Sequence, residues 1–127
     1  MISSSSLLLL LLGASLSSAQ LKVYSLRATD LPSNLVSTTD GYVKVYVGSK
    51  SIGQTTVRND DTDPWWGEEF AYLDAKENDE LKLEVYDRDL MFDDLLGTCK
   101  RQIRVGTYQH DCFLSKGGTL HYSYTLG

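Results

Sequence analysis

The sequence predicts an all-β protein folded as an antiparallel β-sandwich of eight strands. Short segments rich in β-branched and aromatic residues recur along the chain, at intervals of about 8–16 residues. Polar or glycine-containing turns separate these segments, and no segment repeats its apolar residues with the period of a helix. We therefore expect one β-sandwich and neither a second domain nor an internal repeat.

Apolar residues at alternating positions predict the first four strands. In the first strand the alternation runs through Leu21, Val23 and Leu26, and a polar loop follows it. The second strand is rich in valine and tyrosine, a Gly-Ser-Lys turn leads into the third, and a tryptophan pair opens the fourth. These strands are expected at residues 21–28, 41–47, 52–57 and 65–72.

The last four strands show the same pattern. Leu81, Leu83 and Val85 alternate with charged residues after a polar turn, which predicts the fifth strand. A lysine followed by two glycines marks the final turn of the chain. These strands are expected at residues 80–86, 96–105, 108–114 and 119–126.

The first 19 residues predict a secretory signal peptide. They contain no charged side chain, and residues 7–12 are all leucine. Ser17 and Ala19 supply the small side chains that precede a cleavage site, although the basic residues usual at the start are missing. A membrane-spanning helix would need about 18 or more apolar residues. We therefore expect a secreted, extracellular protein with one domain over residues 20–127.

Charge and cysteine content narrow the function further. The net charge of −5 argues against nucleic-acid binding, which depends on lysine and arginine. Cys99 and Cys112, in an exported chain, predict a disulfide that stabilises by roughly 3 kcal/mol on the chain-entropy model. A zinc site is not expected, because no Cys-x-x-Cys occurs and His110 and His121 stand apart.

One segment concentrates negative charge around large apolar side chains. Clustered carboxylates repel one another and raise each other's pKa unless a cation lies between them. Ligands that are all oxygen suit Ca²⁺, although a solvated acidic loop is the alternative explanation. The segment contains four carboxylates, Asp87, Asp89, Asp93 and Asp94, around the apolar residues Leu90, Met91 and Phe92.

Three motifs resemble those of the C2 domain family. Residues 39–45 are similar to the family's SDPYVKV segment, and residues 63–70 resemble its NPxWNExF segment, with Trp66 and Phe70 as core aromatics. Residues 84–97 are similar to its VYDxD…DxxG loop. The motifs follow the family order and cover nearly all of residues 20–127. Together with the two cysteines, they look most like the C-terminal C2 domain of perforins.

The resemblance implies a sandwich of the type II permutation, whose three loops at one end hold Ca²⁺. Asn34 departs from the family's usual aspartate and brings no charge. The third loop is one residue shorter than is common, so whether Asp93 or Asp94 is the last ligand stays open. The implied ligands are Asp40, Asp87, Asp89, Asp93 and Asp94, with weaker contributions from Asn34, Asn59 and the backbone carbonyl of Arg88. Such an extracellular site is expected to bind Ca²⁺ at a Kd on the order of 10⁻⁴–10⁻³ M.

Apolar residues beside these ligands predict a membrane contact. A Ca²⁺ ion would bridge the carboxylates to phospholipid phosphates while apolar loop tips insert into the bilayer surface. Packing among the loops is the alternative for the apolar residues of the first loop. The expected membrane-contacting residues are Leu35, Val36, Leu90, Met91 and Phe92, with Trp65 as a weaker candidate.

The predicted function is therefore Ca²⁺-dependent binding of a phospholipid membrane by a secreted protein that is monomeric in solution. One alternative is a C2-like sandwich that binds an unidentified protein partner without Ca²⁺. A secreted hydrolase is not expected, because no Gly-x-Ser-x-Gly motif occurs and neither histidine has an identifiable nucleophile beside it. A third alternative is host defence or membrane damage together with a partner, since a C2-like module alone has no pore-forming segment.

Overall fold

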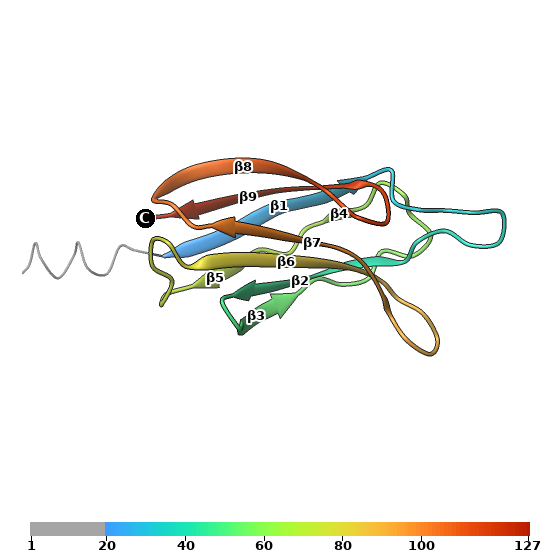
Figure 1. The fold of residues 1–127 in the computed structure, drawn as a ribbon, viewed down its shortest axis with the longest axis horizontal. Coiled ribbons are helices and arrows are strands. Elements are labelled where there is room, and N and C mark those ends of the chain that lie inside the picture. Colours follow the sequence, from blue (N-terminus) through green and yellow to red (C-terminus); the bar gives the residue numbers. More distant parts are fainter. Residues whose placement is uncertain (1–19) are drawn as a thin grey trace, which may run out of the picture.

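A computed structural model of the chain describes residues 20–127 as two antiparallel β-sheets packed face to face (Figure 1). The first sheet has the order β4-β1-β9-β8, with β5 also paired to β1, and the second has the order β3-β2-β6-β7. The strands are β1 (Leu21–Thr29), β2 (Gly41–Val47), β3 (Lys50–Gln54), β4 (Trp65–Trp66), β5 (Phe70–Tyr72), β6 (Glu80–Asp87), β7 (Asp94–Gln102), β8 (Gly106–Phe113) and β9 (Thr119–Leu126). The predicted signal peptide lies outside the described residues.

The predicted β-sandwich is confirmed, with one strand interrupted. The strand expected over residues 65–72 is divided into β4 and β5, which both pair with β1. The interruption lies opposite a bulge in β1, where the register with β9 shifts between Tyr24 and Arg27 and Ser25 has a φ of 54°. A bulge disrupts the local ladder, so the neighbouring edge strand loses its pairing there.

The strand order agrees with the type II permutation. The last strand, β9, lies between β1 and β8 and pairs antiparallel with both, from Leu21↔Leu126 to Thr29↔Thr119 on the β1 side. No helix occurs between residues 20 and 127, so the described part of the chain contains no helical segment able to cross a bilayer.

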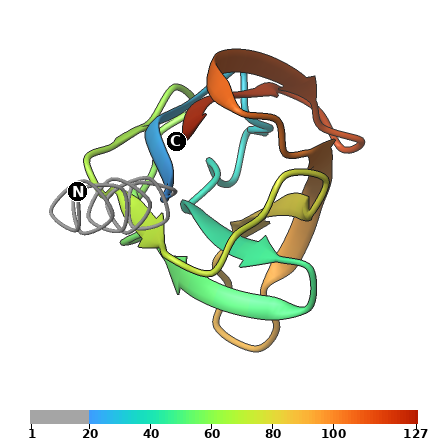
Figure 2. The same ribbon diagram turned by 90° about the vertical axis from the view of Figure 1, so that its left-hand side faces the viewer.

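Apolar side chains from both sheets fill the space between them. Figure 2 views the molecule from the end opposite the loops and shows the two sheets curving around this interior. Trp66 is buried as expected, and its indole N–H donates to the carbonyl of Gly41 at 3.2 Å. Phe70 lies against Gly53, where an added Cβ would come within 2.6 Å of the ring. Only glycine fits that position at its φ of +149°.

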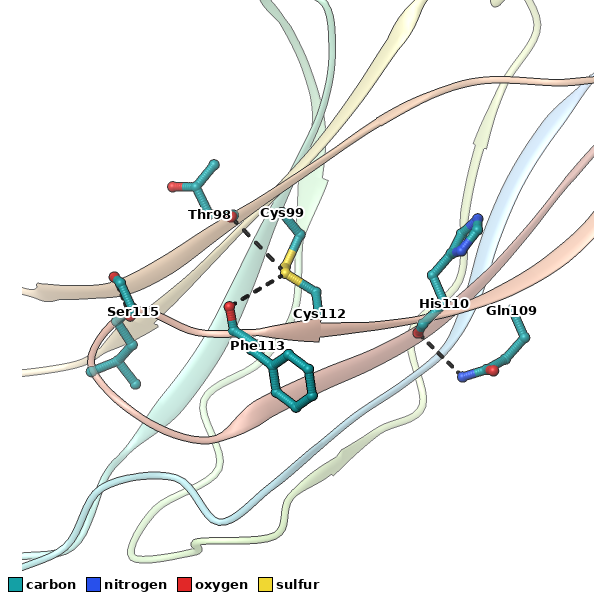
Figure 3. Close-up of a disulfide and its surroundings, with 8 residues drawn as sticks. Thr98, Cys99, Gln109, His110, Cys112, Phe113 and Ser115 are labelled. Carbon is teal, nitrogen blue, oxygen red and sulfur yellow. Dashed lines mark hydrogen bonds between the residues drawn. A yellow bond between two sulfur atoms is a disulfide. The ribbon is translucent and has the colours of Figure 1, made fainter.

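The two sheets are joined covalently where their edge strands β7 and β8 face each other (Figure 3). The predicted disulfide between Cys99 and Cys112 is present, with the Cα atoms 6.0 Å apart. Nearer the loops, Gly97 lets the backbones approach closely, because an added Cβ would lie 2.9 Å from the Cα of Leu114. The glycine of the third motif is therefore needed for packing between the sheets. We call this junction of β7 and β8 the seam.

Candidate functional site at the loop end

Three loops meet at one end of the sandwich, on the right of Figure 1. They connect β1 to β2, β3 to β4, and β6 to β7, and we call them loops one, two and three. Each follows or precedes a strand whose apolar residues are anchored in the core, so rigid elements hold the loop bases. Loops one, two and three comprise residues 30–40, 55–64 and 88–93.

Hydrogen bonds donated by backbone N–H groups tie the bases of the three loops together. The carboxylate of Asp87 accepts the N–H of Asp40 at 2.9 Å, and the N–H of Arg88 donates to the carbonyl of Asp40 at 2.9 Å. The Asp40 carboxylate in turn accepts the N–H of Asp60 at 2.7 Å. Asp40 therefore contacts both other loops. Sequence reasoning assigned it as a ligand but missed its role in joining the loops.

The carboxylates at the loop bases influence one another electrostatically. Partial burial raises the pKa of the Asp87 carboxyl, and the negative charges of Asp40, Asp94 and Asp89 raise it further. The N–H of Asp40 partly offsets this effect. Asp94 is the register partner of Asp87 across β6 and β7. The fold thus places four of the predicted ligand carboxylates close enough together for the charges of three to raise the pKa of the fourth, Asp87.

Asp93 is held differently from these four carboxylates. Its side chain accepts the hydroxyl of Tyr42 and, at 3.1 Å, the N–H of Asp89. The Tyr42 hydrogen bond holds the pKa of Asp93 below its usual value, and Lys44 and Arg88 contribute in the same direction. Asp93 therefore fixes the shape of loop three through Tyr42 on the outer face of β2.

Tyr42 is a residue of this region that sequence reasoning missed. Its ring stacks on Tyr86 with centroids 5.4 Å apart, and burial raises the pKa of its hydroxyl, as does the hydrogen bond to Asp93. The residue remains a donor at neutral pH. Tyr42 is buried like Val43 but lies outside the core cluster between the sheets, and its partner on loop three could not be read from spacing.

A cleft of about 310 Å³ opens between the loops. Four of the predicted ligand residues and one apolar loop-tip residue line it. Between residues 20 and 127, no three carboxylate, imidazole or thiol side chains are arranged as a ready-made metal-binding group. Asp87 borders a neighbouring hollow of about 110 Å³ instead. The cleft is lined by Asp40, Asn59, Arg88, Asp89 and Leu90.

The donor atoms around this cleft fit a hard divalent cation. The carboxylates of Asp40 and Asp89 and the amide of Asn59 line the cleft together with Arg88 and Leu90. Burial is the main cause of the raised pKa of the neighbouring Asp87, and the charges of Asp40, Asp94 and Asp89 add to it. Asp89 uses one oxygen to accept the N–H of Leu90 at 2.6 Å, which leaves its second oxygen available. These oxygen atoms are of the type that Ca²⁺ prefers, and they are spread around the cleft.

Asn34 has a structural role in loop one. Its side-chain carbonyl accepts the N–H groups of Val36 and Ser37, each at 2.8 Å. Its own N–H donates to the carbonyl of Ser37 at 2.8 Å. This turn is typical of asparagine. The amide oxygen of Asn34 therefore shapes the turn of loop one, and its weaker contribution as a metal ligand stays a prediction.

The apolar loop tips project into solvent. This arrangement differs from the alternative of local packing, in which Leu35 and Val36 would be covered by neighbouring loops. Trp65 is less free, since the guanidinium of Arg27 lies 5.4 Å from the centre of its ring. The exposed fractions are 106% for Leu35, 94% for Val36, 101% for Leu90, 82% for Met91 and 79% for Phe92.

Residues 19–117 match the model of the C2 domain family. The chain belongs to the C2 domain family. It is similar to human perforin-1, with 33% identity over 102 residues that make up 78% of this chain and 18% of that protein. The chain thus spans less than a fifth of this curated relative's length.

Solved structures agree with this assignment. One described as the structure of a C2 domain is 58% identical, with a TM-score of 0.83, and the match covers 86% of this chain and 98% of that one. A calcium-bound structure of a pair of C2 domains from extended synaptotagmin 2 has a TM-score of 0.73 at 24% identity. That match covers 87% of this C2 domain and 46% of the other chain, and it shows similarity of fold.

Proposed function

We propose that this C2 domain is a secreted module that binds phospholipid membranes in a Ca²⁺-dependent manner. The observation that carries the proposal is the placement of five exposed apolar side chains on the loops that also carry the carboxylate cleft. Exposed apolar residues that adjoin a charged site are a feature of surfaces that bind membranes. Membership of the C2 domain family supports the same function.

The proposed cation ligands are the carboxylates that share one negative field: Asp40, Asp87, Asp89 and Asp94. The carbonyl of Arg88 and the amide of Asn59 complete an oxygen-only set of the kind Ca²⁺ prefers. When bound, the ion supplies positive charge that offsets the carboxylates and accepts lipid phosphate oxygens. Asp93 stays with Tyr42 and keeps loop three in place.

The apolar tips then supply the second part of the binding energy. Burial of apolar area contributes about 25 cal/mol per Å² removed from water. The acidic ligands of loop three adjoin its apolar tip residues, Leu90, Met91 and Phe92. Docking of this loop therefore brings the ligands and the apolar tip to the bilayer surface together. Neutralising the ligands removes the repulsion between the acidic loops and anionic lipids.

Co-sedimentation with liposomes tests this function. Vesicles of phosphatidylcholine and phosphatidylserine should carry the protein into the pellet with millimolar Ca²⁺ and leave it in solution with a chelator. The double variant Asp87→Ala, Asp89→Ala should stay in solution in both conditions. A double variant of aspartates away from the loops, Asp74→Ala with Asp79→Asn, changes the net charge equally, keeps an acceptor for the N–H of Lys76, and should behave as the unmodified protein.

One observation favours the alternative of a protein partner bound without Ca²⁺. Asp40, Asp87 and Asn34 already accept backbone N–H groups, and the described residues contain no ready-made group of three metal ligands. A sandwich whose loops are held by such hydrogen bonds needs no ion to keep its shape. An unchanged melting temperature on addition of millimolar Ca²⁺ would support this alternative.

A further inference from the structure

A second cavity lies on the seam, toward the end of the molecule opposite the three loops. It is a groove of about 450 Å³, a size typical of small-molecule sites. A hollow of about 280 Å³, lined partly by Asn78 and Glu80, shares Lys100, Arg101 and Gln102 with it. The groove itself is lined by Lys100, Arg101, Gln102, Arg104, Tyr108, His110 and Tyr124.

Positive charge is concentrated in this groove although the chain carries a net charge of −5. The guanidinium of Arg104 donates to the amide oxygens of Asn78 at 2.6 Å and of Gln102 at 3.0 Å. These bonds orient the group without neutralising it. Across residues 20–127, neither Arg104 nor Lys100 nor Arg101 forms an ion pair, and the acidic side chain lining the adjoining hollow is Glu80.

Aromatic rings form the inner wall of the groove. His110 lies against Tyr124 and Tyr108, with ring centroids 6.0 and 6.2 Å apart. Figure 3 shows its imidazole on the same side of β8 as the disulfide sulfur of Cys112, directed toward the seam. Burial lowers the pKa of His110, and the nearby charge of Arg101 lowers it further. Both effects favour the uncharged imidazole, and the negative charge of Asp111 opposes them.

One polar atom in this wall has no partner. The Nε2 of His110 is buried, and no atom of residues 20–127 forms a hydrogen bond with it. Leaving a buried polar atom without a partner costs free energy, so such atoms usually contact water or a ligand. This atom lies in a residue that lines the groove, beside three uncompensated cations.

We propose that the groove binds a phosphate ester. Guanidinium groups suit the geometry of phosphate oxygens, so Arg101 and Arg104 contact the phosphate. Lys100 alternates with Arg101 along β7 and adds positive charge from the neighbouring face. The ring of Tyr108, which is 37% exposed, covers the organic part of the ligand.

The phosphate could belong to a soluble ester or to a phosphorylated lipid headgroup. The groove lies at the end of the sandwich away from the apolar loop tips. If those tips contact a bilayer, as the proposed function requires, the groove faces water. Its position therefore favours a soluble ester over a headgroup in the same bilayer.

Titration with inositol 1,4,5-trisphosphate, followed by amide chemical shifts, tests this proposal. The buffer is freed of Ca²⁺ with an immobilised chelator, so no soluble polyanion competes and the calcium site plays no part. We expect saturable shifts at residues 100–110 and at Tyr124. Removing one charged hydrogen bond should weaken binding about tenfold or more in each of the variants Arg101→Gln and Arg104→Gln.

Lys50→Gln, an exposed cation outside the groove, is the matched control and should leave binding within about twofold. Lys100→Gln tests the groove separately if either arginine variant fails to fold. The proposal is overturned if no saturable shift occurs, or if Lys50→Gln weakens binding as much as the groove variants. Binding only to phosphatidylcholine vesicles that contain phosphatidylinositol 4,5-bisphosphate would overturn the soluble source and assign the site to a headgroup.

Discussion

The carboxylate of Asp87 accepts the backbone N–H of Asp40 at 2.9 Å, and this contact joins loop three to loop one. The next residue, Arg88, returns a hydrogen bond to the carbonyl of Asp40. Two segments that lie 47 positions apart in the chain are thus fixed side by side. The predicted cation ligands at their bases are therefore held by backbone geometry, whereas the apolar tips beyond them remain exposed.

Replacing Asp87 by asparagine should separate stability from calcium binding. Asparagine keeps an oxygen to accept the Asp40 N–H but removes a charge whose pKa is raised by burial and by neighbouring carboxylates. Without Ca²⁺ at neutral pH, the variant should melt no lower than the unmodified protein. At a Ca²⁺ concentration of about ten times Kd, the unmodified protein should gain about 1.4 kcal/mol, or about 5 °C, and the variant should gain far less. A lower melting point without Ca²⁺ would contradict this role of Asp87.

Acidification should weaken calcium binding. A carboxyl whose pKa is raised takes up a proton at a higher pH than an isolated aspartate, so protons compete with the cation earlier. In the calcium-free protein, the raised pKa means that Asp87 binds a proton more tightly in the folded state than in the unfolded state. Its contribution to the free energy of unfolding is therefore present at low pH and is lost as the pH rises through the folded pKa. Calcium titrations at pH 7.5 and pH 5, followed by melting temperature, measure the effect. Equal affinity at both values would exclude it.

The two adjacent aspartates of loop three should differ in role. Asp94 shares the negative field of Asp87, whereas Asp93 is bonded to Tyr42 and to the N–H of Asp89. Asp94→Asn should lower calcium affinity directly. Asp93→Asn should mainly speed amide hydrogen exchange at residues 89–93, and Tyr42→Phe should reproduce that change. A larger loss of calcium affinity in Asp93→Asn than in Asp94→Asn would reverse the assignment.

Replacing Phe92 by alanine should weaken membrane binding and leave calcium binding nearly unchanged. The ring is exposed in the free protein, so its removal costs little stability, while burial of a large apolar side chain contributes about 1.5–3 kcal/mol. A loss of that much binding free energy corresponds to at least a tenfold lower partition coefficient into vesicles. Leu73→Ala, an exposed apolar residue away from the three loops, is the matched control. Parallel loss of calcium affinity in Phe92→Ala would show that the two roles are not separate.

Much of the fold could be predicted because burial of one strand face leaves a pattern of period two. Val43 and Val45 on β2, and Leu81 and Leu83 on β6, alternate as expected and lie in the core. The division of the fourth expected strand was not predictable. It depends on the bulge near Ser25 in another strand, a tertiary feature without a local signal.

The site was predictable in its residue types and less so in its contacts. Asp40 precedes β2 and Asp87 ends β6. These two strands pair, so the proximity of the two residues follows from the topology. Two contacts depend on the direction of side chains within irregular loops. They are the turn closed by the Asn34 side chain and the hydrogen bond from Tyr42 to Asp93. The basic groove was missed because its residues come from strands that meet only at the seam.

Co-sedimentation with phosphatidylserine-containing liposomes, with Ca²⁺ and with a chelator, tests the proposed function most directly. The proposed function requires the protein in the pellet at millimolar Ca²⁺ and in the supernatant with chelator, and it requires Asp87→Ala with Asp89→Ala to abolish the difference. Pelleting that is equal in both conditions, or absent in both, would contradict it.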